Sequence, residues 1–248
     1  MSFIGGDFLS EKSLRYERQL ILPEIGQQGQ AKLESASILV VGAGGLGAPV
    51  LQYLAAAGVG HIGIIDGDVV SESNLNRQIL YGGQDIGKQK ATQAAKRLQY
   101  LNDNIKVTPM PIMLTDENSV EIISDYDLLV LCLDSLKSRK IANRGCVAAK
   151  VPFVDAAVGG FYGTLVTVIP GETPCYDCIH GFSVQPKGLI PILGAMAAWV
   201  GCAEALTVIR FLIGADDPSR GTMLMFNGTE MTIEQIQIEK NPKCMCNQ

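Results

Sequence analysis

Ser37-Ile-Leu-Val-Val-Gly-Ala-Gly-Gly-Leu-Gly47 is the stretch of sequence that decides the fold of this chain. Residues 38–41 form a continuous aliphatic run, of the kind that is buried on both faces of a parallel sheet. Three glycines, Gly42, Gly44 and Gly47, then satisfy the GxGxxG pattern. They permit a tight turn and bring backbone N–H groups at a helix N-terminus close to phosphate oxygens. The stretch predicts a strand, a phosphate-binding turn and a helix; the alternative is a glycine-rich turn without a ligand.

An acidic residue follows at the expected distance. Asp66 lies 19 residues beyond Gly47 and ends the second apolar run, His61–Ile65. Folds of this type place here the carboxylate that accepts hydrogen bonds from ribose hydroxyls. The motif indicates a nucleotide site but does not choose among enzymes, because many dehydrogenases share it.

Composition narrows the class of protein. A chain of 248 residues with 47% hydrophobic and 18% charged residues has enough apolar side chains for a large core. The net charge of -5 and a pI near 5.1 give no basic surface for nucleic acid. Seven cysteines without a visible secretory signal indicate free thiols or metal ligands, and a cytoplasmic protein. The uncharged stretch 189–203 is shorter than a membrane span, so we expect a buried helix with its lead-in and no membrane contact.

Strand and helix patterns alternate along the chain. This order predicts a doubly wound, Rossmann-like α/β fold with a mostly parallel sheet. The expected strands are 38–41, 61–65, 106–110, 128–133 and 152–157, and the expected helices are 15–22, 48–57, 88–101, 116–123 and 141–150.

The pattern changes after about residue 160. An extended segment at 163–170, a two-cysteine turn and an apolar helix through Ile213 precede two last strands, 222–226 and 231–239. We expect Asn227-Gly228 to join these strands and the strands to extend the sheet in antiparallel fashion. Since no repeat or linker interrupts the chain, residues 1–248 are expected to form one domain, with the nucleotide-binding part at about 13–157 and a second part at about 158–248.

A second motif follows the second strand, Asp66-Gly-Asp-Val-Val-Ser-Glu-Ser-Asn-Leu-Asn-Arg-Gln78. A hydride-transfer enzyme has no use for a second acid, an asparagine and an arginine at this place. Arg77 is expected to face the phosphates of a nucleoside triphosphate, since its guanidinium group can stabilise charge on a departing pyrophosphate. Lys90, at a helix start, is a second candidate cation. The alternative for both residues is a solvated surface charge.

Asp134 ends the apolar run 128–133. Ligands of open α/β sheets bind at the carboxyl ends of strands, so Asp66 and Asp134 should lie at the same edge of the sheet. Asp134 is therefore expected to hold Mg²⁺ that bridges the triphosphate, directly or through water. The alternative is that it caps the following helix, and the two roles are compatible.

Together these motifs resemble the ubiquitin-activating-enzyme-like adenylyltransferases, and within them the enzymes of molybdopterin and thiamine biosynthesis. The likeness runs from about residue 13 to the C-terminus. The motifs that carry it are Arg15-Tyr-Glu-Arg-Gln19, Gly42-Ala-Gly-Gly-Leu-Gly47, Asp66-Gly-Asp68, Ser73-Asn-Leu-Asn-Arg-Gln78, Lys90, Asp134, Cys175-Tyr-Asp-Cys178 and Asn241-Pro-Lys-Cys244.

The resemblance implies a reaction and its participants. Members use ATP and Mg²⁺ to adenylate the C-terminal glycine of a small ubiquitin-like sulfur-carrier protein that ends in Gly-Gly, and they act as homodimers. The adenylate then passes to a separate sulfur donor, and the second part of the chain binds the carrier.

The matching positions imply site residues. Arg18, Arg77, Lys90 and Asp134 would be catalytic, with Arg18 reaching the triphosphate bound by the other subunit. The positions that would bind ATP are Gly42, Gly44, Gly45, Gly47, Asp66, Asp68, Ser73, Asn74, Leu75, Asn76, Arg77, Gln78, Lys90, Asp134 and Ser135. Relatives usually carry asparagine where this chain has Ser135.

Such a reaction needs few acid–base groups. A C-terminal carboxylate has a pKa of about 3.5, so it is ionised without a general base. The barrier is charge repulsion, which arginine, lysine and Mg²⁺ reduce. We therefore expect His61 and His180 to be structural or surface residues.

The cysteines match the family less well. Cys175 and Cys178 are expected to supply half of a tetrahedral zinc site. Relatives complete it with a second CxxC pair, whereas this chain has Cys244-Met-Cys246, so free thiols on a tail are the alternative. No cysteine occurs in the segment 179–188, where relatives carry one for sulfur transfer, and Cys132, Cys146 and Cys202 are expected in the core. We expect adenylation without a covalent cysteine intermediate.

Three alternatives stay open. An enzyme of the same class could adenylate a peptide or another carboxylate and form an amide or a cyclic product. A carrier-binding scaffold without turnover would keep the fold, and a dinucleotide oxidoreductase would keep the glycine motif. The arginine, the lysine and the second aspartate argue against the last two.

Overall fold

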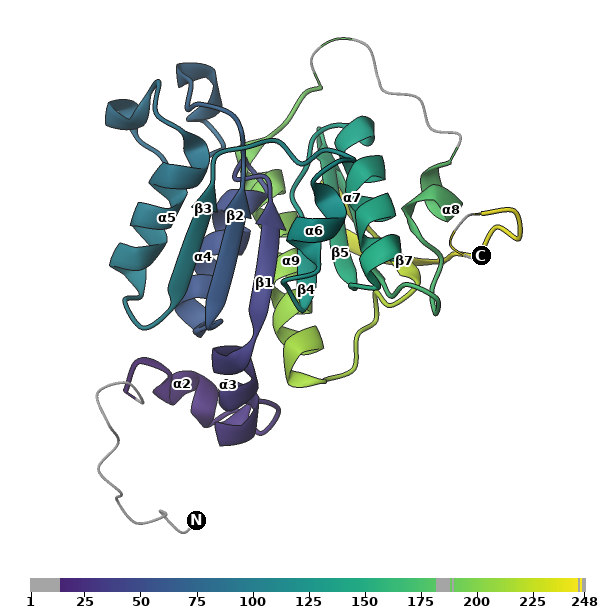
Figure 1. The fold of residues 1–248 in the computed structure, drawn as a ribbon, viewed down its shortest axis with the longest axis horizontal. Helices are drawn as coiled ribbons and strands as arrows, with labels where there is room; N and C mark the ends of the chain where they lie inside the picture. The colour runs from purple at the N-terminus through teal and green to yellow at the C-terminus, as the bar shows by residue number, and fades with distance from the viewer. Residues whose placement is uncertain (1–13, 182–187, 189, 245, 247–248) are drawn as a thin grey trace.

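The computed structural model describes residues 14–181, 188, 190–244 and 246, which form one eight-stranded sheet in the order β3-β2-β1-β4-β5-β6-β7-β8 (Figure 1). The strands are β1 Ser37–Val41, β2 His61–Ile65, β3 Lys106–Met110, β4 Leu128–Leu131, β5 Phe153–Gly159, β6 Tyr162–Val168, β7 Thr222–Asn227 and β8 Thr232–Gln237. Strands β1 to β5 pair in parallel, and β6, β7 and β8 continue the sheet in antiparallel fashion. The predicted fold class is confirmed.

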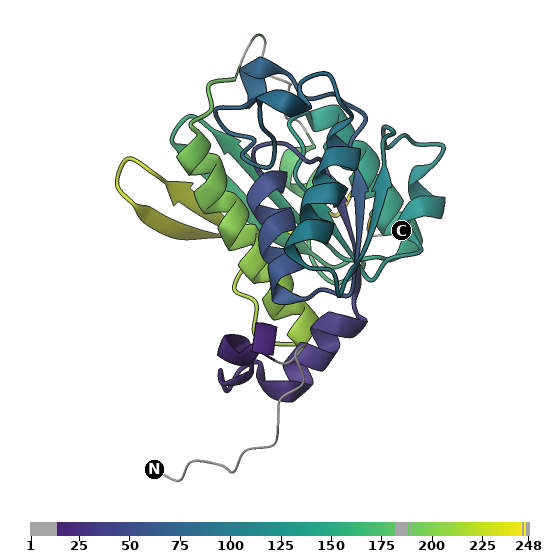
Figure 2. The same ribbon diagram turned by 90° about the vertical axis from the view of Figure 1, so that its left-hand side faces the viewer.

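Helices cover both faces of this sheet (Figures 1 and 2). The helices are α2 Glu17–Leu20, α3 Gly26–Ser35, α4 Gly47–Ala57, α5 Lys90–Leu101, α6 Ser119–Ile123, α7 Leu136–Ala149, α8 Tyr176–His180 and α9 Gly194–Ile213, with short 3-10 turns η1 Glu72–Asn74 and η2 Gly83–Asp85. One face carries α4, α5 and α9, and the other carries α6, α7 and α8.

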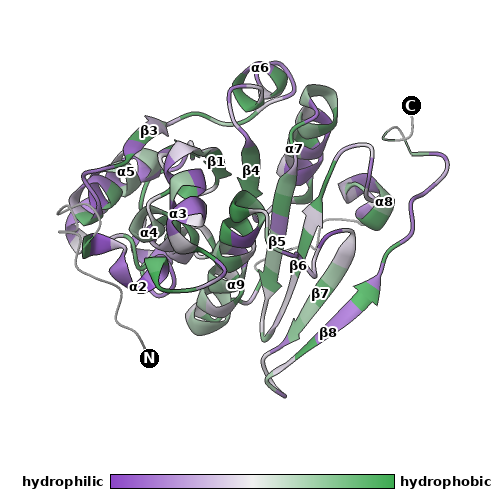
Figure 3. Ribbon diagram, turned by 90° about the horizontal axis from the view of Figure 1, so that it is seen from below, coloured by the Kyte–Doolittle hydropathy of each residue, from purple (hydrophilic) through white to green (hydrophobic). Residues whose placement is uncertain are grey.

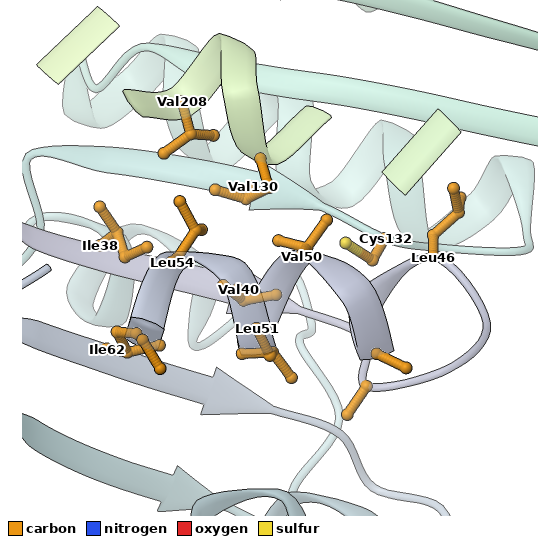
Figure 4. Packing of buried hydrophobic residues seen from close by; sticks show 14 of the residues in the cluster. Ile38, Val40, Leu46, Val50, Leu51, Leu54, Ile62, Val130, Cys132 and Val208 are labelled. Carbon is orange, nitrogen blue, oxygen red and sulfur yellow. The ribbon is translucent and has the colours of Figure 1, made fainter. Parts of the chain in front are cut away.

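Strand β1 contributes to a core on each face, as its aliphatic run predicts. Ile38 and Val40 are fully buried against α4 and α9, where Leu54 and Val208 meet them (Figure 4). Leu39 belongs to the opposite cluster, with α6 and α7. Burying each of these side chains contributes roughly 1.5–3 kcal/mol to the stability of the fold. The glycine turn therefore follows a strand that is firmly held on both faces.

Helix α9 is the apolar helix that the sequence predicts. It begins at Gly194 and continues beyond the uncharged stretch 189–203 to Ile213. It spans 20 residues, so by length and composition it would pass for a membrane span, and our length argument was wrong. In the fold it packs against α4, α3 and β5. A Cβ atom at Gly201 would lie 2.7 Å from the carbonyl oxygen of Leu46, so glycine permits this close approach.

Several boundaries differ from the prediction. The strand predicted at 128–133 ends at Leu131, and the helix predicted at 141–150 already begins at Leu136. The hydroxyl of Ser135 accepts the N–H of Ser138 at 3.1 Å, and this N-cap starts the helix early. The helix predicted at 15–22 shrinks to four residues, while α3 and α8 were not predicted.

The last hairpin forms an exposed edge of the sheet. The turn between its strands covers residues 228–231, where Asn227 Oδ1 accepts the N–H groups of Thr229 and Glu230. All six residues of β8 are exposed, and Figure 3 shows polar and apolar residues mixed along this strand. The predicted pairing of the last two strands is confirmed.

Candidate functional site

A pocket of about 590 Å³ lies at the carboxyl ends of β1, β2 and β4, the upper end of these strands in Figure 1. Most of the predicted nucleotide-binding residues meet there. Those that line it are Gly42, Gly44, Gly45, Asp66, Asp68, Arg77, Gln78, Lys90, Asp134 and Ser135. An apolar wall of Ile112, Met113 and Leu114 stands beside them.

The glycine turn has the close contacts that its motif predicts. Gly42 has a φ of 99°, and a Cβ atom there would lie 2.4 Å from the carbonyl oxygen of Cys132. A Cβ atom at Gly47 would lie 2.1 Å from the carbonyl oxygen of Gly42, so Gly47 shapes the turn from outside the pocket lining. At Gly44 and Gly45 a Cβ atom would meet only side chains, at 3.4 Å or more.

Asp66 ties the glycine turn to the second strand. Its Oδ2 accepts the N–H of Ala43 at 2.8 Å, and its Oδ1 accepts the N–H of Asp68 at 2.9 Å. Burial raises the pKa of this carboxyl above its ordinary value, and the two N–H groups and Lys90 oppose that shift. Each oxygen still has acceptor capacity for a ligand hydroxyl.

Two cations stand on the same side of the pocket. Lys90 begins α5, and its Nζ lies 3.0 Å from Asp68 Oδ2. The Nη1 of Arg77 donates to the carbonyl oxygen of Ser73 and to Asn76 Oδ1, both at 2.9 Å. Gln78 is buried beside them, and its Oε1 has no hydrogen-bond partner among the described residues.

The rest of the Ser73–Gln78 motif builds the turn that presents these side chains. Residues 73–76 lie outside the pocket lining. The carbonyl oxygen of Asn74 accepts the N–H groups of Arg77 and Gln78 at 3.1 and 3.0 Å, and Leu75 packs on the core. A role for residues 73–76 in direct contact with a nucleotide stays a prediction.

Asp134 is exposed at the pocket edge, just after β4. It lies at the same edge of the sheet as Asp66, as predicted. Ser135, rather than Asp134, is the N-cap of α7, so the capping alternative was wrong. Asp134 therefore lines the pocket without serving as a helix cap.

Arg18 lies far from this pocket in its own chain. It is exposed on α2, at the opposite end of the sheet (Figure 1). Neighbouring contacts fix this segment: Tyr16 OH accepts from Asn102 at 2.8 Å, and Gln19 donates to the carbonyl oxygen of Ala57 at 3.2 Å. That Arg18 serves a second subunit stays a prediction.

Sequence reasoning missed a buried ion pair behind the pocket. Arg139, which lines the pocket, pairs with Asp155 on β5, and both side chains are almost fully buried. Burial raises the pKa of Asp155 to about 6, against the lowering effect of Arg139. The sequence signal for this pair is an acid, Asp155, inside the apolar strand 152–157.

A second buried carboxyl lies close to this pair. Glu204 on α9 is fully buried, and Cys132 Sγ lies 3.5 Å from its Oε2. Burial raises the pKa of Glu204 well above its ordinary value, and the nearby Asp155 adds to the shift. Cys132 packs in the core as predicted, although it also lines the pocket.

Four cysteines come together beside α8, outside the pocket lining. The sulfur atoms of Cys175, Cys178, Cys244 and Cys246 all lie within 4.8 Å of one another. Sγ–Sγ distances are 3.9 Å for 175–178, 3.4 Å for 175–244 and 3.5 Å for 178–246. A tetrahedral ion with Zn–S bonds of about 2.3 Å has S–S edges of about 3.8 Å, so the set fits such an ion.

Donor groups and burial also favour metal ligands over free thiols on a tail. Cys175 and Cys244 are buried, and the other two cysteines are half-buried. The N–H of Asn241 donates to Cys178 Sγ at 3.4 Å, and Asn143 donates to Cys175 Sγ at 3.8 Å. The Cys-x-Cys pair therefore reaches the same cluster as the Cys-x-x-Cys pair.

The two histidines stand outside the pocket, as expected. His61 contacts the hydroxyls of Ser37 and Thr108, both at 2.9 Å, and His180 packs on Tyr176. Burial lowers the pKa of each imidazole. Residues 182–187 and 189, in the segment before α9, lie outside the described residues.

Comparison with known proteins identifies the family. The ThiF family matches residues 16–247. The chain is 40% identical over 241 residues to the sulfur carrier protein adenylyltransferase of Thermus thermophilus, covering 93% of this chain and 89% of that protein. It is 38% identical over 245 residues to adenylyltransferase and sulfurtransferase MOCS3 of Mus musculus, covering 96% of this chain but 53% of that protein. The chain thus spans about half the length of MOCS3.

Solved structures agree with the fold. The crystal structure of E. coli MccB with ATP superposes with a TM-score of 0.84 and 25% identity, over 94% of this chain and 74% of MccB. Named relatives are adenylyltransferases, as the motifs predicted. The chain belongs to the ThiF family.

Proposed function

We propose that this protein uses ATP to adenylate the C-terminal glycine carboxylate of a small ubiquitin-like sulfur-carrier protein and releases pyrophosphate. The observation that carries the proposal is the meeting of Arg77, Lys90 and Asp134 around the glycine turn in one pocket. The relative in Thermus thermophilus, a sulfur carrier protein adenylyltransferase, supports the carrier as substrate.

The reaction is a substitution at the α-phosphorus. A carboxylate oxygen of the carrier forms a bond to that phosphorus while the bond to the pyrophosphate oxygen breaks, which gives an acyl-adenylate and pyrophosphate. The attacking carboxylate is already ionised, since the pKa of a C-terminus is about 3.5. The protein therefore supplies orientation and positive charge.

Each side chain of the pocket has a role in this proposal. The glycine turn places its N–H groups against phosphate oxygens. Asp66 accepts hydrogen bonds from the ribose, and Arg77 and Lys90 neutralise the charge that develops on the departing pyrophosphate. The apolar wall at 112–114 offers a surface for the adenine base.

A divalent cation fits the same site. Mg²⁺ prefers carboxylate oxygens together with phosphate oxygens, and Asp134 is an exposed acidic residue of the pocket lining. When bound, Mg²⁺ would neutralise part of the phosphate charge.

The cysteine cluster is proposed to bind a structural zinc ion. Cys175 and Cys178 flank the start of α8, whereas Cys244 and Cys246 come from the C-terminal segment. A metal bound to both pairs would fix that segment against the body of the protein. This function is structural because the cluster lies outside the pocket lining.

The proposal includes the assembly and the parts of the chain. We infer a cytoplasmic homodimer in which Arg18 of each subunit reaches the nucleotide of the other. Residues at about 13–157 would bind the nucleotide, and those at about 158–248 would bind the carrier and zinc. A separate sulfur donor would consume the adenylate.

A second candidate is adenylation of a peptide. MccB structures include one with the peptide MccA and an ATP analogue, at 25% identity to this chain. The higher identity to carrier adenylyltransferases favours the carrier.

Exchange of pyrophosphate into ATP tests the proposal. Exchange should require the carrier and should disappear when the last glycine of the carrier is removed. Exchange with a short peptide but with no Gly-Gly carrier would favour the second candidate, and absence of exchange with both would favour a scaffold.

A further inference from the structure

Arg139, which lines the pocket, holds together three elements of the fold. It lies on α7, with 4% of its surface exposed. Its Nη1 donates to Asp155 Oδ1, and its Nη2 donates to the carbonyl oxygen of Leu133 and, at 2.8 Å, to that of Ala156. One guanidinium group thereby joins α7, the segment after β4, and β5.

These contacts lie beside the residue that we propose to hold Mg²⁺. Leu133, whose carbonyl oxygen accepts from Arg139, immediately precedes Asp134. Ser135 on the other side is fixed as the N-cap of α7. Pairing of β4 with β5 ends at Leu131 and Asp155, so the ladder no longer supports the backbone at Asp134. Arg139 supplies this support instead.

Lysine cannot replace this arrangement. Guanidinium is planar and donates to several acceptors in fixed directions, whereas an ammonium group is a point charge on a flexible chain. Asp155 balances the buried charge of Arg139, and Glu204 and Cys132 pack close to the pair. The guanidinium group and its acceptors therefore fix one arrangement of the backbone at this place.

We propose that Arg139, held by Asp155, is a positioning residue that sets the place of the Asp134 carboxylate and thereby the binding of Mg²⁺ with ATP. This inference rests on the role of Asp134 in the proposed function. It predicts that Arg139 acts through Asp134 and has little effect where Asp134 no longer binds the cation.

Calorimetric titration of ATP, with and without Mg²⁺ and in the absence of any carrier, measures this directly. In the unmodified protein Mg²⁺ should lower the Kd of ATP. In Arg139→Lys most of that gain should be lost, by roughly 10-fold or more, as when residues that orient a metal ligand are removed. Affinity for ATP without Mg²⁺ should change much less.

A double-mutant cycle separates positioning from a merely structural effect. Asp134→Asn should lose the gain from Mg²⁺, and adding Arg139→Lys to it should change nothing further. The matched control is Arg144→Lys on the same helix, where Arg144 pairs with Asp116 at 2.7 Å on the surface. This control should keep the gain from Mg²⁺.

Clear results would overturn the inference. It is wrong if Arg139→Lys keeps the gain from Mg²⁺, if it weakens ATP binding equally without Mg²⁺, or if Asp134→Asn keeps the gain. If Arg139→Lys does not fold, Asp155→Asn replaces it in the test, because asparagine keeps the shape of the acceptor. Asp155→Asn must then lose part of the gain in ATP affinity from Mg²⁺. If Mg²⁺ lowers the Kd of ATP as expected but no carrier supports pyrophosphate exchange, only the proposed function is rejected.

Discussion

Lys90 Nζ lies 3.0 Å from Asp68 Oδ2, and the lysine side chain is 7% exposed whereas the aspartate side chain is 68% exposed. The ammonium group is thus withdrawn from water but faces a pocket, with one carboxylate beside it. A cation in this position interacts more strongly with a phosphate than an exposed one does, because water screens it less. We therefore expect Lys90 to contribute strongly to binding the phosphates of ATP.

Replacement of Lys90 by methionine should therefore reduce pyrophosphate exchange by roughly 100-fold or more, since preorganised groups that stabilise developing charge contribute on this scale. Methionine keeps the length and the burial of the side chain. Exchange kinetics at saturating carrier measure the effect. Lys88→Met is the matched control, because Lys88 is exposed and pairs at 3.7 Å with Asp85. Similar losses in both variants would contradict the assignment.

Most of the pocket could be predicted because its residues lie in short motifs. The turn from Gly42 to Gly47 and the motif ending at Gln78 are local in sequence, and parallel strands bring their carboxyl ends to one edge. The helical start at Lys90 was also close to its predicted position.

What could not be predicted depends on contacts distant in sequence. Arg139 and Asp155 pair across 16 residues and two elements, and Cys132 meets Glu204 across 72 residues. In the sequence, such groups are visible only as polar residues within an apolar run, and their partners are not indicated. The cysteine cluster, by contrast, was expected from the two closely spaced cysteine pairs. The sequence did not decide whether the Cys-x-Cys pair would join the Cys-x-x-Cys pair, and the structure brings them together.

Mixing two inactive variants tests whether the site is shared between subunits. Arg18→Ala and Asp134→Asn should each have little exchange activity, because each homodimer carries the same defect in both sites. In an equal mixture that exchanges subunits, half of the dimers are mixed, and each has one intact site. Activity should recover to about a quarter of that of the unmodified protein. No recovery, with subunit exchange verified by a tag, would show that Arg18 does not serve the site of the other subunit.

Loss of one cysteine ligand tests the zinc site. Metal analysis should give about one zinc ion per chain, and Cys246→Ser should reduce this to near zero. Thermal unfolding should begin at a lower temperature, because a midpoint shifts by about 2–4 °C per kcal/mol in a chain of this size. Cys202→Ser on α9, which is half-buried and outside the cluster, should keep the metal. Purified protein without zinc would refute the four-cysteine site.

Glu204 predicts a pH dependence of stability. Burial raises the pKa of Glu204 in the folded protein, whereas in the unfolded chain the carboxyl ionises near its ordinary pKa of 4.5. Unfolding above that pH therefore releases a proton, so this group makes the free energy of unfolding fall as pH rises, by about 1.4 kcal/mol per pH unit, until the folded pKa is reached. The titratable and charged groups that face Glu204 are Asp155, Arg139 and Cys132.

Glutamine at this position keeps the shape but cannot ionise. Glu204→Gln should thus gain stability relative to the unmodified protein as pH increases, which urea unfolding at pH values of about 5.5, 6.5 and 7.5 measures. A cost of the new amide that does not depend on pH lowers the free energy of unfolding equally at every pH. The informative quantity is therefore the slope of the free energy of unfolding against pH. Glu234→Gln on the exposed strand β8 is the control, because its surroundings change little on unfolding. Parallel pH profiles for Glu204→Gln and the unmodified protein would show that Glu204 is ionised in the folded state.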